Sequence, residues 1–99
     1  MLQVVGNDKY SKAIEKITQE QGKIVGEEIA VEMASTIEGI NINQEKMEII
    51  TDNPKLTLEK LVEQFSTLFG LVSIQVSKDA LKSIEINFTQ EELPEILKS

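Results

Sequence analysis

Small side chains recur every four residues in the first third of the chain. They are Gly22, Gly26, Ala30 and Ala34, and large apolar residues stand three positions beyond each of them: Val25, Ile29, Met33 and Ile37. Residues three and four apart share one face of a helix. The pattern therefore predicts a helix with a smooth groove flanked by an apolar ridge. Such a groove lets a second helix approach closely, with the four-step ridges of both helices interlocking.

The same periodicity predicts one long helix, or two collinear helices, from about residue 8 to Ile37, closed by Gly39. Glycine suits the left-handed position that ends many helices. Glycine inside a helix costs up to about 1 kcal/mol relative to alanine, so an alternative is that Gly22 ends one helix and a second begins at Lys23. The apolar stripe keeps its phase across Gly22, which favours the continuous helix.

Short alternating segments follow the first helix. Apolar and polar residues alternate at Ile40 and Ile42 and again at Met47 and Ile49, with a polar turn between them. Alternation of this kind predicts a β-hairpin at 40–50 with one buried face. A further alternating segment near 84–88 predicts another strand, and the apolar residues within 1–6 fit either a strand or a tail.

A second long helix is predicted to begin at Asn53-Pro54, since asparagine caps helices and proline fits the first helical position. Apolar residues then recur at helical spacing through Gly70: Leu58, Leu61, Val62, Phe65, Leu68, Phe69, Val72, Val76 and Ala80. Small residues form a thin side on this helix at Ser66, Gly70, Ser73 and Ser77. We expect the thin sides of the two helices to pack together.

The segment 72–77 also has a competing interpretation. Its apolar and polar residues alternate, and β-branched residues favour strands, so the helix would then stop at Gly70. The stripe stays in phase from Leu58 to Ala80, which favours the helix.

The last eleven residues begin with a capping box from Thr89 to Glu92 and predict a short C-terminal helix. Pro94 removes one helical hydrogen bond, so we expect only a turn or two. The apolar residues of this segment either fold back onto the core or form an acidic docking tail for another protein: Leu93, Ile96 and Leu97.

Together these elements predict a single domain, residues 1–99, of the α+β class and mainly α. It consists of two long amphipathic helices packed closely, a small antiparallel sheet and a short C-terminal helix. The sheet combines the hairpin near 40–50 with the strand near 84–88.

The amino-acid composition excludes several kinds of catalytic and metal-binding site. The chain has no Cys, His, Arg or Trp, so it lacks thiolates, the commonest metal ligand and the usual general base near neutral pH. Ten lysines face seventeen acidic residues, and the net charge of −7 disfavours nucleic acid and anionic membranes. Catalysis by carboxylates and lysine, for instance Glu27 and Glu28 with Lys23, remains a minor option.

Four acidic residues form a candidate interaction face: Glu27, Glu28, Glu32 and Glu38. Glu27 can reach back to Lys23, whereas the other three have no lysine nearby in sequence. A solvated surface explains them. A site for Ca²⁺ or Mg²⁺ is the alternative, although no stretch resembles a calcium-binding loop. We therefore expect neither a metal nor a cofactor.

The function expected from these features is a non-enzymatic protein-interaction or assembly module. Its partners would be itself, as a homodimer built on close helix packing, and another protein, with no nucleic acid and no membrane. The alternative is a small-molecule or lipid binder with an aliphatic cavity between the helices. The chain has no apolar run of roughly 20 residues and no recognisable signal peptide, so a cytoplasmic location is expected.

Overall fold

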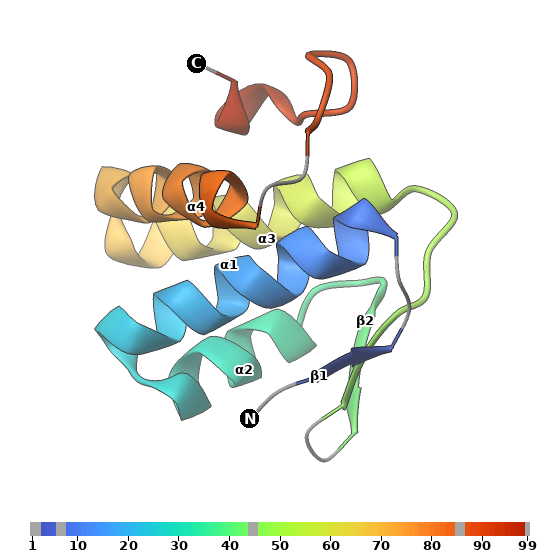
Figure 1. Ribbon diagram of the computed structural model, residues 1–99. Helices are drawn as coiled ribbons and strands as arrows, with labels where there is room; N and C mark the ends of the chain where they lie inside the picture. Colours follow the sequence, from blue (N-terminus) through green and yellow to red (C-terminus); the bar gives the residue numbers. More distant parts are fainter. Residues whose placement is uncertain (1–2, 6–7, 44–45, 85–86, 99) are drawn as a thin grey trace.

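Four helices and a small sheet make up the fold in the computed structural model, which describes residues 3–5, 8–43, 46–84 and 87–98 (Figure 1). The helices lie side by side, and the sheet lies at one side of them. This arrangement confirms the predicted α+β, mainly α class. The two long helices predicted from periodicity are each divided in two, however, and the division occurs at a glycine.

The first predicted helix is a helical hairpin. Helix α1 (Lys9–Val25) ends at Gly26, and helix α2 (Glu27–Ser35) runs back beside it (Figure 1). The backbone of Gly26 has φ 105° and ψ 135°, which only glycine adopts without strain. The prediction of one continuous or collinear helix was therefore wrong, and the break lies at Gly26 and not at Gly22.

The second predicted helix is divided in the same way. Helix α3 (Pro54–Phe69) ends at Gly70, with φ 83° and ψ −167°, and helix α4 (Leu71–Ser83) turns back from it. The predicted cap is present, since the Asn53 side chain accepts a hydrogen bond from the Leu56 amide at 3.2 Å. Residues 71–77 are helical, as the stripe predicted, but the helix does not run through Gly70.

The sheet has the order β1-β3-β2, formed by β1 (Gln3–Val5), β2 (Ile40–Asn43) and β3 (Lys46–Ile49). Strands β2 and β3 are antiparallel and confirm the predicted hairpin, with Met47 fully buried. The third strand is β1, which pairs in parallel with β3. The strand predicted near 84–88 is not found at residues 84, 87 and 88, and 85–86 lie outside the described residues.

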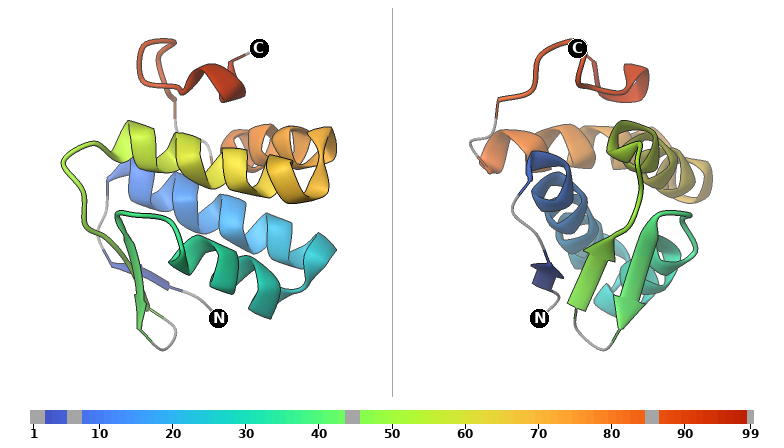
Figure 2. Two further views of the ribbon diagram at one scale, coloured as in Figure 1. Left: turned by 180° about the vertical axis from the view of Figure 1, so that it is seen from behind. Right: turned by 90° about the vertical axis from the view of Figure 1, so that its right-hand side faces the viewer.

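Helix α1 lies at the centre of the core and contacts the other three helices (Figure 2). Its apolar face meets that of α3 through fully buried side chains: Ile14, Ile17, Leu58, Leu61, Val62 and Phe65. The C-terminal segment ends in a 3-10 turn, η1 (Glu95–Leu97), which contacts α3 and α4. Every described helix thus contributes to one core, and the two glycine turns lie at its edge.

Candidate interaction surface at the helical hairpin tips

The small residues of the predicted groove lie between α1 and α2. Gly22 is on α1, whereas Ala30 and Ala34 are buried on α2 and Gly26 forms the turn. A Cβ atom on Gly22 would lie 3.2 Å from the Glu27 Cα and 3.6 Å from the Ala30 Cβ. The small side chains do permit a close helix approach, but the two helices are the halves of the single predicted one. The groove is thus already filled within the chain.

The small residues of the second predicted helix meet α1. Ser73 and Ser77 are fully buried on α4, and the Gln21 Nε2 donates to the Ser73 carbonyl at 2.9 Å and to the Ser77 Oγ at 3.3 Å. The Ser77 hydroxyl donates to the same carbonyl at 2.8 Å. These bonds hold the end of α1 against the start of α4. Ser66 and Gly70 lie closer to the end of the hairpin, where Gly70 is exposed.

One buried polar atom in this contact has no partner. The Ser73 Oγ makes no hydrogen bond within the described part of the chain. Gln21 was recognisable in the sequence only as a polar residue on the apolar face of α1, and its bonds to α4 explain that position.

Both glycine turns lie at the same end of the molecule, as the opposite views in Figure 1 and Figure 2 show. Large apolar side chains are exposed there, on either side of each turn. We call them the tip patch: Ile24 (58% exposed), Ile29 (50%), Leu68 (56%), Phe69 (37%), Leu71 (82%) and Val72 (60%). Summed over both turns, the exposed surface of these residues is roughly 600 Å², comparable to the largest apolar patch of a typical monomer, and it is divided between the α1–α2 and α3–α4 turns.

The two halves of the tip patch differ in charge. Residues 64–77, which span the α3–α4 turn, contain no charged side chain, although 27% of the whole chain is charged. The α1–α2 turn is flanked by Lys23, Glu27 and Glu28, all exposed. Lys23 pairs with Glu20 at 3.0 Å and lowers the pKa of that carboxyl, yet its side chain is 70% exposed. The patch is therefore uncharged on one side and bordered by charges of both signs on the other.

The four residues of the predicted acidic face are all exposed. Glu27, Glu28 and Glu32 are exposed on α2, and Glu38 is exposed in the connection to β2. In the described ranges no three acidic side chains gather closely enough to hold a metal ion. The face remains a candidate surface for a protein partner.

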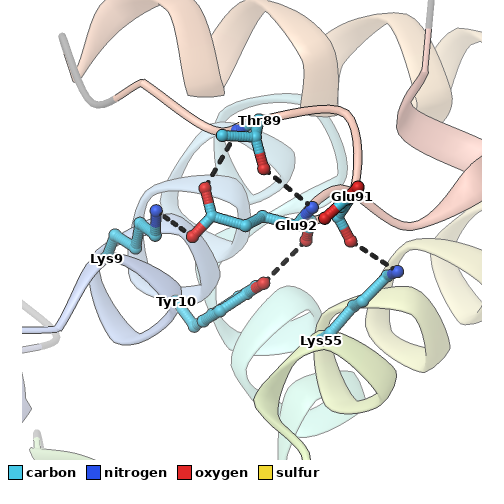
Figure 3. A network of polar contacts seen from close by, with 6 residues as sticks. All are labelled: Lys9, Tyr10, Lys55, Thr89, Glu91 and Glu92. Carbon is cyan, nitrogen blue, oxygen red and sulfur yellow. Dashed lines mark hydrogen bonds and ion pairs between the residues drawn. The ribbon is translucent and has the colours of Figure 1, made fainter.

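The predicted capping box is present, although it closes a turn and not an α-helix (Figure 3). The Thr89 amide donates to the Glu92 Oε1 at 2.9 Å, and the Glu92 amide donates to the Thr89 Oγ1 at 3.2 Å. Glu92 also pairs with Lys9. The hydrogen bonds from Lys9 and Thr89 lower the pKa of the Glu92 carboxyl.

Two further hydrogen bonds attach this turn to the helices. The Tyr10 hydroxyl donates to the Glu92 carbonyl at 2.7 Å, and the Lys55 Nζ donates to the Glu91 carbonyl at 2.7 Å (Figure 3). The candidate docking residues follow the turn and lie on the core: Leu97 is buried, and Leu93 and Ile96 are half-buried. Of the two predicted alternatives, the structure has the tail folded back.

A cavity of about 380 Å³ lies beside α1 and α2, within the size range of small-molecule sites. The residues that line it are mostly polar in type, although the surface that they present to the cavity is mainly apolar: Lys16, Thr18, Gln19, Gly22, Lys23, Glu27 and Val31. This differs from the aliphatic cavity between helices that the sequence suggested. Among the described helices, none combines the length and the apolar character needed to cross a bilayer.

Comparison of the chain with protein-family models, curated proteins and solved structures finds no match. What the chain does must therefore be argued from its own surface. The part of the tip patch at the α3–α4 turn lies within the uncharged residues 64–77, in contrast to the charged character of the chain as a whole.

Proposed function

We propose that this protein is a non-enzymatic interaction and assembly module that forms a homodimer. The observation that carries the proposal is the tip patch, six large apolar side chains exposed at one end of the molecule. Its roughly 600 Å² compares with about 800 Å² buried per partner in an interface of standard size. A second molecule covering the patch would remove most of this apolar surface from water.

The location of the patch supports an intermolecular role. Several of the small residues first expected to form a helix-packing groove are engaged inside the chain. Gly22 lies against α2, and Ser73 and Ser77 accept hydrogen bonds from Gln21 of α1. The tip residues lie beyond these contacts, on both sides of Gly26 and Gly70. Folding leaves them exposed, so they are available for contact with a second molecule.

Support for a non-enzymatic role comes from side-chain chemistry. The chain has no histidine or cysteine, which removes the commonest bases and nucleophiles. Lys23, Glu27 and Glu28, the residues considered for carboxylate and lysine catalysis, are exposed. Exposed charged groups retain their hydration, which weakens the electrostatic effects that catalysis exploits.

Light scattering during size-exclusion chromatography tests the proposal. We expect the mass to approach twice that of the monomer as the protein concentration rises from the low micromolar to the millimolar range. A constant monomer mass across this range would refute the homodimer.

A small-molecule binder is the second candidate, favoured by the cavity of about 380 Å³ beside α1 and α2. Native mass spectrometry of the purified protein would reveal a retained ligand together with the number of subunits. Val31→Trp would fill the cavity, so a ligand that binds there should be lost from this variant. Retention of the same ligand by the variant would exclude the cavity as its site.

A further inference from the structure

The charge distribution over the tip patch indicates how a second copy would approach. Leu71, at the start of α4, is the most exposed large apolar side chain of the patch, at 82%, and lies within the uncharged residues 64–77. Leu68 and Val72 lie close to it in sequence, at 56% and 60% exposure. Their exposed side chains give the α3–α4 turn an apolar surface.

Two-fold symmetry restricts which residues can lie at the centre of a homodimer. On the axis each side chain meets the same side chain of the other copy. A charged group there would be opposed by its own charge, whereas an apolar group packs against its equivalent. Within the tip patch the α3–α4 half meets this requirement, because the α1–α2 half is flanked by Lys23, Glu27 and Glu28.

The charged half suits the rim of the same interface. Protein interfaces typically have an apolar centre and a polar, hydrated rim. The bond from Gln21 to the Ser73 carbonyl holds the end of α1 beside the start of α4, so the two turns approach a partner as one surface. Glu27 and Glu28 are exposed, and Lys23 is 70% exposed although it pairs with Glu20, so charges of both signs lie at this rim.

From these observations we infer that two copies of this chain meet at their α3–α4 turns across a two-fold axis. Leu71 of each copy packs against its equivalent, and the α1–α2 turns form the rim. The inference rests on the proposed homodimer and specifies its interface. It places the axis on a surface that, in the described part of the chain, the monomer leaves uncovered.

Opposite charges at Leu71 test the arrangement. Leu71→Lys and Leu71→Glu should each weaken self-association by roughly 100-fold or more, because both copies lose a buried leucine and gain a like charge at the axis. An equimolar mixture of the two variants should restore dimers of mixed composition, detected by native mass spectrometry. Ile50→Lys and Ile50→Glu are the matched controls, since Ile50 is 61% exposed and directly follows β3, outside both glycine turns.

The absence of cysteine provides a second measurement. Leu71→Cys should give a covalent dimer when an added oxidant converts the two facing thiols into a disulfide, and Ile50→Cys should not. This test does not require the charged variants to fold, and far-UV circular dichroism checks that they do.

The outcomes separate the inference from the proposed function. A wild-type protein that remains monomeric overturns both. A wild-type dimer that the Leu71 variants do not weaken overturns the inference alone and leaves the homodimer in place. Variants that dissociate singly but form no mixed dimer, with no covalent dimer from Leu71→Cys, place Leu71 away from the two-fold axis and also overturn the inference.

Discussion

Replacing Gly70 by alanine isolates the energetic cost of the backbone turn between α3 and α4. Gly70 has φ 83° and ψ −167°, a region that is essentially restricted to glycine. A Cβ atom built there meets no heavy atom within 4 Å. The substitution therefore introduces backbone strain without a steric clash.

The expected loss is about 1–3 kcal/mol in the free energy of unfolding, the usual cost of one residue in such a conformation. A helix that continued through Gly70 would instead gain up to about 1 kcal/mol from alanine. The two structures thus predict changes of opposite sign. For a domain of this size, each 1 kcal/mol corresponds to about 4–8 °C in the melting temperature.

Urea denaturation followed by far-UV circular dichroism measures this change. The measurement is best made in the Leu71→Lys background, so that an altered dimer does not contribute. Gly70→Asn should be destabilised as well, because asparagine tolerates the left-handed helical region but the ψ of Gly70 lies outside it. Thr67→Ala, at an exposed site of α3, should change stability by less than about 0.5 kcal/mol. A Gly70→Ala variant with the same free energy of unfolding as the parent would refute the positive-φ turn at Gly70.

Three other measurements address the buried serines, the tail and the dimer. Ser73→Ala should raise the melting temperature, because the Ser73 Oγ is buried without a hydrogen-bond partner in the described chain. Ser77→Ala should instead lower the free energy of unfolding by about 1 kcal/mol through the loss of its hydrogen bonds. Equal shifts in the melting temperatures of the two variants would contradict this assignment. The pKa of Glu92 is lowered in the folded state, so its stabilisation is complete above the ordinary glutamate pKa and is lost as the pH falls through the lower folded value. Glu92→Gln should therefore flatten the acid side of the stability–pH curve, and an unchanged curve would exclude this contribution. Each copy carries a charge of −7, so added salt should screen the repulsion between the two copies. The dissociation constant of the dimer, measured by sedimentation, should therefore fall as the salt concentration rises. A dissociation constant that rises with salt would indicate an interface held by ion pairs.

Periodicity predicted the type of the helices but not their ends. The apolar stripe keeps its phase across Gly26 and Gly70 because the two helices of each hairpin contribute to the same core. The hydrophobic pattern is therefore the same for a helical hairpin as for one continuous helix. Glycine costs up to about 1 kcal/mol inside a helix, which is too little to distinguish the two arrangements. The hairpin at 40–50 was predictable because its alternation and its partner are both local.

The tip patch could be predicted only in part. The uncharged stretch 64–77 is visible in the sequence, but Leu68, Phe69 and Val72 were assigned to the apolar stripe of one continuous helix. In the structure they are 56%, 37% and 60% exposed. The reversal at Gly70 places them at the end of the helical hairpin, where the neighbouring helices do not cover them. Which apolar residues are exposed depends on the turn, and the turn was not predictable from the pattern.

The bond between the Tyr10 hydroxyl and the Glu92 carbonyl joins residues that are 82 positions apart, which has a consequence for the order of folding. Helical hairpins consist of local contacts and form quickly, whereas contacts between distant residues must first overcome the entropy of closing a long loop. The attachment of the C-terminal turn to α1 is therefore expected after the transition state. Interactions that form after the transition state mainly slow unfolding. This contact should therefore lower the unfolding rate, and so prolong the lifetime of the folded chain, without raising the folding rate.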